Sequence, residues 1–246
     1  MLENIQLTEI NGEKVFEFSI CADHRDQEIP IWQKKVFDKF GAKINQLYFE
    51  FGRLGLSHGQ VIDWIMEQIK DRKDIDYVVM WENDSLPLRK DYLQIIYDKI
   101  KDKNTIMGSS QRSQHKVKFG GTTNHVYAAT PFSISIKLYN KIGRPTFDHH
   151  IPRSDTYEEV GFRVEELGYN VCLVYPRSTI GLTPSEMEEL HCPTPKALVC
   201  QEVYSGFGTV FGDNLWFHTF FPPVSSHKKH FIQKCQEVLS GKFDNY

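Results

Sequence analysis

The sequence predicts an α/β fold built on a mixed, mainly parallel sheet that is flanked by helices. Segments typical of strands and of amphipathic helices alternate through the first half of the 246-residue chain. This order implies parallel strands joined by right-handed crossovers. Polar or glycine-containing segments follow successive strands, and such segments meet at the carboxyl edge of an open sheet, where ligands bind.

Hydrophobic spacing marks the first two strands and the helix between them. Residues 14–22 alternate apolar and polar side chains and then become continuously apolar, which predicts a strand. A helix that ends before Gly41 follows, because apolar residues recur at helical spacing. These residues are Trp32, Val36, Phe37 and Phe40. Residues 47–51 are the next predicted strand.

The remainder of the first half repeats this pattern. An amphipathic helix over residues 61–69 leads to a strand that starts at Tyr77 and runs into an acidic triplet, and a second such helix covers 92–100. The carboxyl edge of the sheet should therefore collect three polar segments. They are residues 21–26, 52–59 and 82–84.

The second half is less regular. Residues 131–136 are a predicted strand, and 137–142 a short helix that ends at Gly143. The aromatic run at 215–221 is expected to pack in the core, because aromatic side chains bury a large area, and an acceptor platform is its alternative role. Apolar positions on one face predict a final helix over 226–239.

No linker clearly separates these segments. We therefore expect a single domain over residues 1–246, in two halves of about 1–110 and 111–246.

Composition excludes several protein classes. With 40% hydrophobic residues, 25% charged residues and a net charge of -3, the chain has globular values and no general attraction for polyanions. No apolar run is long enough to cross a bilayer, and the N-terminus lacks a secretory signal pattern, so we expect a cytoplasmic protein. The five cysteines form no Cys-x-x-Cys pair, which argues against a disulfide framework or a structural zinc site.

The most informative chemical feature is the acidic triplet Glu82-Asn83-Asp84, which follows a strand and precedes Pro87. Glu82 and Asp84 are two positions apart, so their carboxylates point to the same side if the strand stays extended. Two such oxygen ligands can converge on one divalent cation. The structural alternative is a turn or a cap for the next helix, roles for which Asp and Asn are common.

The triplet resembles the Asp-x-Asp motif of GT-A glycosyltransferases, whose carboxylates hold Mn²⁺ or Mg²⁺ against the diphosphate of a sugar nucleotide. Residues 132–148 and 155–174 resemble the acceptor half of the family 2-like members. There, a strand and short helix end in Gly and a Phe-Asp pair, an acidic cluster opens a helix that carries an Arg, and Gly-Tyr leads into the next strand. The corresponding residues are Gly143, Phe147-Asp148, Arg163 and Gly168-Tyr169. The resemblance covers roughly residues 15–183.

This resemblance implies a nucleotide-sugar-binding half followed by an acceptor half with a C-terminal extension. It also implies metal-dependent transfer of a sugar from a nucleotide-diphosphate sugar to an acceptor hydroxyl, with inversion. We expect Asp84 to contact the Mn²⁺ or Mg²⁺ directly, and Glu82 to contact it indirectly or to bind ribose. His218 is a candidate distal ligand because imidazole suits transition metals, whereas a hydrogen-bonded core histidine is its alternative role. His125 and His191 are weaker candidates.

An inverting displacement needs a carboxylate that removes the proton of the acceptor hydroxyl. Asp155 is the first candidate for this base, Glu159 the second and Glu158 the third. Asp155 and Glu158 also fit the spacing of a capping-box-like arrangement, which requires no catalysis.

Residues of the donor pocket follow from the same resemblance. Asp23 corresponds to an acidic residue that reads the base or ribose, and its alternative role is that of a turn residue. The other expected pocket residues are Ala22, His24, Gly55 and Asn83. A UDP- or GDP-sugar is the expected donor, and the acceptor is a glycan, a protein or a small molecule.

A modified nucleic acid is a less favoured acceptor. Only small basic clusters could contact it, at Arg112, Lys116, Lys118 and Lys228-Lys229.

Two functions from other classes remain open. The segment Gly55-Leu56-Ser57-His58-Gly59 matches the Gly-x-Ser-x-Gly pattern of a hydrolase nucleophile elbow, with Asp213 and His218 available downstream for a triad. The predicted strand ends at Phe51, however, too early for a sharp elbow. A non-catalytic sugar-binding protein with the same fold is the other alternative.

Overall fold

The computed structural model describes residues 2, 4–22, 27–49, 56–112, 126–148, 156–180, 208–219 and 225–245. Its strands are β1 (Thr8–Ile10), β2 (Glu13–Ala22), β3 (Ile44–Phe49), β4 (Tyr77–Glu82), β5 (Ser85–Pro87), β6 (Thr105–Arg112), β7 (Val126–Ser135), β8 (Asn170–Val174), β9 (Pro176–Thr179), β10 (Thr209–Phe211) and β11 (Trp216–His218). Its helices are α1 (Glu28–Lys39), α3 (His58–Ile69), α4 (Tyr92–Ile100), α5 (Ile136–Lys141), α6 (Glu158–Glu166) and α9 (Ser225–Leu239).

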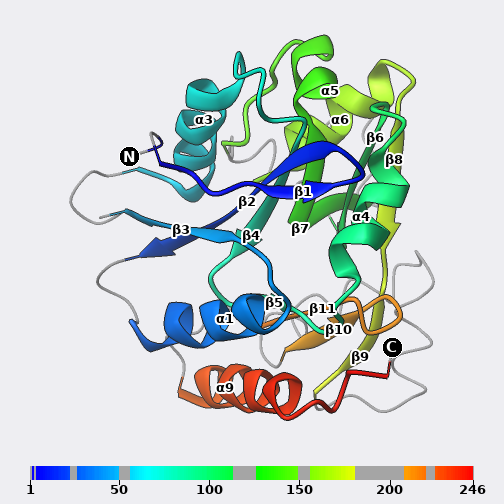
Figure 1. The fold of residues 1–246 in the computed structure, drawn as a ribbon. Coiled ribbons are helices and arrows are strands. Elements are labelled where there is room, and N and C mark those ends of the chain that lie inside the picture. Colours follow the sequence, from blue (N-terminus) through cyan, green and yellow to red (C-terminus); the bar gives the residue numbers. More distant parts are fainter. Residues whose placement is uncertain are drawn as a thin grey trace.

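The larger sheet has the strand order β1-β2-β4-β7-β6-β8, and β3 also pairs with β2 (Figure 1). Strands β2, β3 and β4 are parallel, as their alternation with α1 and α3 predicts. Pairing is also parallel between β6 and β8, whereas β1–β2, β4–β7 and β6–β7 are antiparallel. The chain therefore has the mixed α/β sheet flanked by helices that the sequence predicts.

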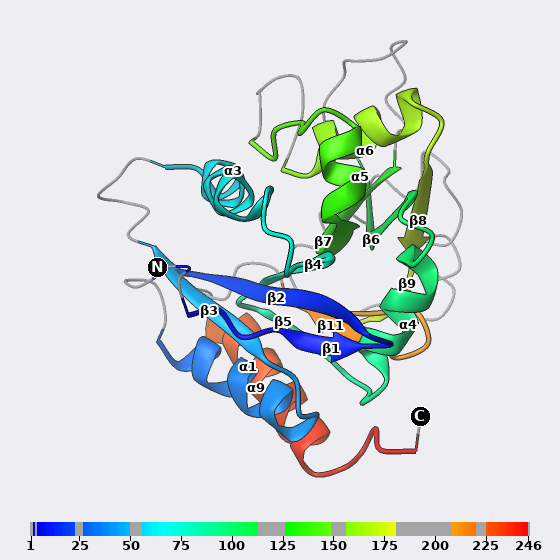
Figure 2. The same cartoon turned by 45° about the horizontal axis from the view of Figure 1, so that its top comes forward.

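Helices cover both faces of this sheet (Figure 2). On one face, α3, α5 and α6 pack on side chains of β2 and β4 such as Phe18 and Met80. On the other face, α1 and α4 pack on alternate residues of the same strands, including Val79 and Trp81. The alternation of side chains along a strand thus divides the apolar residues between two cores.

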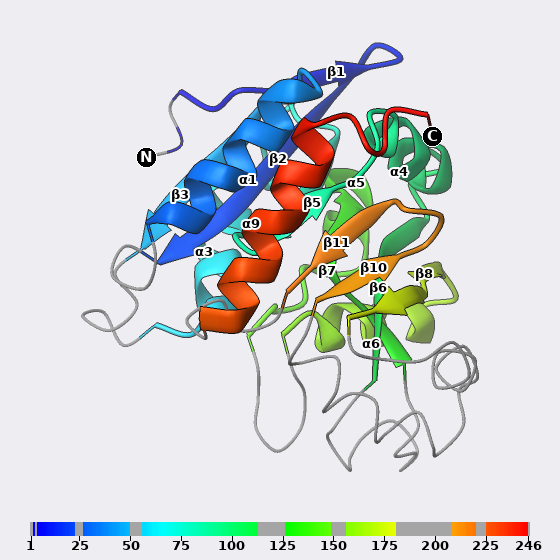
Figure 3. The same ribbon diagram turned by 90° about the horizontal axis from the view of Figure 1, so that it is seen from below.

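A second, smaller sheet has the order β5-β11-β10-β9 and is antiparallel throughout. It lies beside α1 and α9, which pack against each other (Figure 3). Trp216 and Phe217 of β11 are buried, as expected for the aromatic run. Strand β5 begins three residues after β4 ends, so this small sheet adjoins the carboxyl edge of the central strands.

Several boundaries differ from the sequence-based expectation. Strand β3 begins at Ile44 rather than at residue 47, and β7 begins at Val126 rather than at residue 131. Strands β1 and β6 were not predicted, because short or polar segments such as Ser109-Ser110-Gln111 lack the alternation that marks a strand. Within the described residues, no helix has both the length and the apolar character needed to span a membrane.

Candidate metal centre

The acidic triplet forms a turn between two strands. Strand β4 ends at Glu82, Asn83 and Asp84 make the turn, and Ser85 begins β5. The Ser85 hydroxyl closes this turn, because Oγ accepts a hydrogen bond from the Glu82 N–H at 3.1 Å and donates one to the Glu82 carbonyl at 2.9 Å. Glu82 and Asp84 are therefore held by the same short turn.

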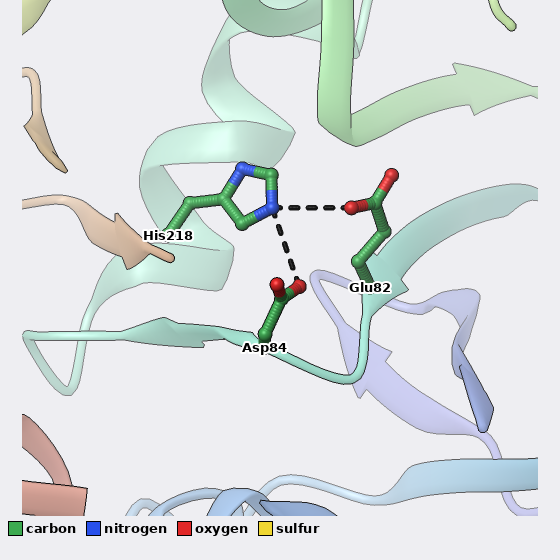
Figure 4. Close-up of side chains that lie close together, drawn as sticks. All are labelled: Glu82, Asp84 and His218. Carbon is green, nitrogen blue, oxygen red and sulfur yellow. Dashed lines mark hydrogen bonds and ion pairs between the residues drawn. The ribbon is translucent and has the colours of Figure 1, made fainter. Parts of the chain in front are cut away.

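His218 reaches this turn through the smaller sheet. Strand β11 pairs with β5 so that His218 lies opposite Ser85, and the Thr219 N–H donates to the Asp84 carbonyl at 3.0 Å. The His218 Nε2 lies 3.1 Å from Glu82 Oε2 and 3.3 Å from Asp84 Oδ1 (Figure 4). One nitrogen and two carboxylate oxygens thus converge within 4.8 Å of one another.

The three residues differ in their access to solvent. His218 is 1% exposed and Asp84 3% exposed, whereas the side chain of Glu82 retains 27% of its surface. The centre therefore has a buried floor, formed by His218 and Asp84, and Glu82 lies at its open side.

Charge within this centre shifts the pKa of each residue. Burial on its own would lower the pKa of His218, but the neighbouring Asp84 and Glu82 carboxylates raise it to about 10. Burial raises the pKa of Asp84. For Glu82 burial acts in the same direction, but the hydrogen bond and charge of His218, together with the charge of His58, lower its pKa overall. Without a cation, a protonated His218 therefore balances part of the carboxylate charge.

The two distances from His218 to the carboxylates fit ligands of one divalent cation. Two ligands at right angles, each about 2.1 Å from an ion, lie about 3.0 Å apart. The distances from His218 Nε2 to the two carboxylates, 3.1 and 3.3 Å, are close to this value. Because an imidazole nitrogen accompanies the oxygens, the donor set suits Mn²⁺ and other transition metals, whereas Mg²⁺ prefers oxygen ligands alone.

Two residues near the centre were not assigned a role from the sequence. His58 is the first residue of α3, and its Nδ1 lies 3.8 Å from Glu82 Oε1. Its ring packs edge-on against Tyr157, which precedes α6, with ring centroids 6.4 Å apart. His58 belongs to segment 52–59, which the sequence places at the carboxyl edge of the sheet. That position could have identified His58 as a residue near the metal centre.

Ser57 caps a helix in this structure. Its side chain accepts a hydrogen bond from the Gln60 N–H, and Gln60 in turn bonds to the Ser57 N–H, which completes a capping box at the start of α3. The Ser57 hydroxyl also donates to Asp148. A Ser57–His218–Asp213 triad is not assembled, because His218 contacts Glu82 and Asp84, and Asp213 pairs with Arg177.

The candidate base residues surround the first turn of α6. Glu158 is fully buried and Glu159 is half-buried, and Asp155 lies outside the described residues. The residue that caps α6 is Tyr157, with φ of 74° and no side-chain cap bond. The proposed capping box of Asp155 and Glu158 is therefore wrong, because the helix begins two residues later than that box requires.

The structure describes two of the five residues predicted for the donor pocket, Ala22 and Asn83. Ala22 is the last residue of β2, two positions beyond Ile20, which pairs with Glu82, and Asn83 is half-buried in the turn. Asp23, His24 and Gly55 lie outside the described residues, as do His125 and His191. Of the basic clusters, Lys228 pairs with Glu28 at 2.7 Å, and Lys116 and Lys118 lie outside the described residues.

Fold and site together define an α/β protein with a candidate metal centre at the carboxyl edge of its central parallel strands. No protein-family model and no curated protein matches the chain. Solved structures with a partial likeness to the chain include a mutant of Drosophila β-1,4-galactosyltransferase 7, solved with manganese, UDP-Gal and xylobiose. It is 13% identical, with a TM-score of 0.39 and coverage of 64% of each chain.

Two other solved structures show a comparable likeness. Protein A197 of STIV is 15% identical over 64% of this chain and 81% of its own, with a TM-score of 0.42. A 4-diphosphocytidyl-2C-methyl-D-erythritol synthase is 10% identical over 74% of this chain and 97% of its own, with a TM-score of 0.39. At these TM-scores the likenesses do not establish a function for the chain.

Proposed function

We propose that the protein is a metal-dependent glycosyltransferase that moves a sugar from a nucleotide-diphosphate sugar to an acceptor hydroxyl with inversion. One observation carries this proposal: Glu82, Asp84 and His218 converge at the carboxyl edge of the central parallel strands. Ligand sites of open α/β sheets lie at this edge. The resemblance of segments 132–148 and 155–174 to the acceptor half of family 2-like GT-A enzymes supports the same function.

In this proposal Asp84 and His218 hold the metal from the buried side, and Glu82 completes the set from the open side. A divalent ion bound there, Mn²⁺ in preference to Mg²⁺ because of the imidazole, would neutralise the charge of the leaving diphosphate. The partly exposed position of Glu82 also suits a contact with the ribose of the donor.

The chemical step requires a base next to this centre. The acceptor hydroxyl gives its proton to a carboxylate as its oxygen bonds to the anomeric carbon, and the bond to the diphosphate breaks. Asp155 remains the first candidate and Glu159 the second. Tyr157 packs against His58, so the start of α6 adjoins the metal centre, which supports a base from this segment. Glu158 is the weakest candidate, because it is fully buried.

The donor is proposed to lie across the ends of β2 and β4. Ala22 adjoins this edge, and Asp23, His24, Gly55 and Asn83 are the further residues we assign to the pocket. A UDP- or GDP-sugar is the proposed donor. The acceptor is a glycan, a protein or a small molecule, and a modified nucleic acid is less favoured.

A thermal-shift screen of nucleotide sugars with and without Mn²⁺ tests the proposal. A ligand present at 100 times its Kd stabilises the folded state by about 2.7 kcal/mol. We expect UDP- or GDP-sugars to raise the Tm only when Mn²⁺ is present, and a radiolabelled sugar to be transferred or hydrolysed. Binding without any turnover would favour the non-catalytic sugar-binding alternative, and no binding at all would contradict both.

A further inference from the structure

Gln33 places a side-chain amide on the buried face of α1, and the other residues of that face are apolar. The buried residues of α1 are Ile29, Pro30, Gln33, Val36 and Phe37, and Gln33 has no exposed surface. Burying an amide is costly unless its hydrogen bonds are satisfied. The partners of Gln33 therefore show what this position does.

Both partners of the Gln33 amino group belong to the turn that carries the metal ligands. Its Nε2 donates to the Glu82 carbonyl at 2.7 Å and to the Ser85 carbonyl at 2.8 Å. These two carbonyls lie on either side of Asn83 and Asp84 in the sequence. One buried amino group thus connects the two ends of the turn.

Gln46 of β3 sets the orientation of the Gln33 amide. The Gln46 Nε2 donates to Gln33 Oε1 at 3.3 Å and to the Pro30 carbonyl at 2.6 Å. If the Gln33 amide were reversed, its oxygen would face two carbonyl oxygens, and its amino group would face that of Gln46. The network is therefore satisfied in a single orientation.

Such a connection matters because the turn carries two carboxylates of like charge. Glu82 and Asp84 must both face His218, and each raises the cost of keeping the other ionised when no cation is bound. Ser85 Oγ bonds only to Glu82, and Thr219 only to Asp84 among the turn residues described. Gln33 differs from both because it lies outside the turn, on α1, and binds a backbone carbonyl at each end of it.

We propose that Gln33 is a positioning residue. Its hydrogen bonds hold the Glu82–Ser85 turn in its metal-binding conformation before the metal binds. Those hydrogen bonds go to the backbone of the turn and to Gln46, and Gln33 acts by fixing the backbone from which Glu82 and Asp84 project. This inference rests on the proposed metal-dependent function, because it concerns the same centre.

Mn²⁺ binding to the full chain, without nucleotide, tests this role by titration calorimetry or by the loss of the free Mn²⁺ electron-spin resonance signal. Gln33→Met keeps the side-chain length and removes the amide. We expect it to weaken Mn²⁺ binding by about 10- to 100-fold, the usual effect of losing a group that orients metal ligands. Gln46→Met removes the hydrogen bond that orients the Gln33 amide, together with the one to the Pro30 carbonyl, and leaves the bonds from Gln33 to the turn. We expect a weaker effect in the same direction.

The matched control is Asn45→Leu. The side-chain amide of Asn45 also donates to backbone carbonyls, those of Gln6, Glu17 and Lys43, and none of them belongs to the turn. We expect this variant to lower the Tm and to leave the Kd for Mn²⁺ unchanged. If Asn45→Leu weakens Mn²⁺ binding as much as Gln33→Met does, a general loss of stability explains both, and the positioning role is wrong.

The remaining outcomes separate this inference from the proposed function. If the unsubstituted protein binds Mn²⁺ and Gln33→Met binds it equally well, only the role of Gln33 is overturned. If Gln33→Met does not fold, Gln46→Met provides the test. An unchanged Kd for Mn²⁺ in Gln46→Met then overturns the positioning role of Gln33. If the unsubstituted protein binds no Mn²⁺, the metal centre is wrong and this inference is wrong with it.

Discussion

His218 Nε2 lies 3.1 Å from Glu82 Oε2, although 136 positions separate these two residues in the chain. Strand pairing brings them together, because β11 pairs with β5 and β5 follows directly from the turn after β4. A buried imidazole therefore meets two carboxylates at a fixed place in the fold.

Asp84→Asn should abolish Mn²⁺-dependent binding of a nucleotide sugar. The change removes an anionic ligand from the buried side of the centre but almost no volume, so the fold should persist. Thermal shift with UDP- or GDP-sugar, with and without Mn²⁺, measures the effect. Asp213→Asn is the control, because Asp213 is exposed in the turn between β10 and β11 and pairs with Arg177. Full Mn²⁺-dependent transferase activity in Asp84→Asn would show that Asp84 is not a metal ligand.

Ser57→Ala should leave most of the activity and lower the stability. Ser57 caps α3, and loss of an N-cap costs about 1 kcal/mol. Urea denaturation measures the stability, and a fluorophosphonate probe should not label the unsubstituted protein, because the described residues provide no histidine hydrogen bond to Ser57. Covalent labelling of Ser57, together with complete loss of activity in the variant, would instead support a serine hydrolase.

The candidate bases can be separated by conservative changes. We expect Asp155→Ser to cut turnover by roughly two to four orders of magnitude while donor binding survives, since a positioned base contributes about that much. Glu159→Gln should show the same loss if it is the base instead. Glu158→Gln should mainly change the Tm, because Glu158 is fully buried. If none of the three variants lowers turnover, the inverting mechanism is wrong and a retaining one without a dedicated base becomes the better proposal.

Stability should fall as the pH rises, through the carboxyl of Glu17. This side chain is fully buried and accepts hydrogen bonds from Tyr92 at 2.8 Å and from Trp81 at 3.3 Å. Burial raises the pKa of Glu17 from 4.5 to about 7, despite the opposing effect of these hydrogen bonds. The unfolded chain therefore loses this proton first, and the folded state loses about 3 kcal/mol of relative stability between the two pKa values.

The difference in unfolding free energy between Glu17→Gln and the unsubstituted protein isolates this effect. We expect the variant to gain relative stability from pH 5 to pH 8, as measured by urea denaturation, because glutamine does not titrate. Glu13→Gln is the control on the same strand. Burial raises the pKa of Glu13, but its pairing with Lys103 lowers it overall, so its contribution changes only at lower pH. A flat difference for Glu17→Gln over this range would show that Glu17 is not protonated in the folded state near neutral pH.

The sequence was sufficient to predict the central α/β unit. Hydrophobic periodicity located β2, α1, α3, β4 and α4, because burial on one face of a helix or strand leaves a local repeat in the chain. It also placed the acidic triplet after this strand. The reason given for the convergence of Glu82 and Asp84, an extended strand, was wrong, because β4 ends at Glu82 and Asp84 lies in the turn that follows.

Tertiary structure alone decided which distant residues complete the centre. The sequence suggested His218 as one of several candidate histidines, and the register of β11 on β5 brought His218 to the two carboxylates. The approach of His58 to Glu82 and the reach of the Gln33 amide across the turn depend on how α3 and α1 pack on the sheet. Local periodicity carries no information on these pairings, because the free energy that selects them comes from contacts between segments far apart in the chain.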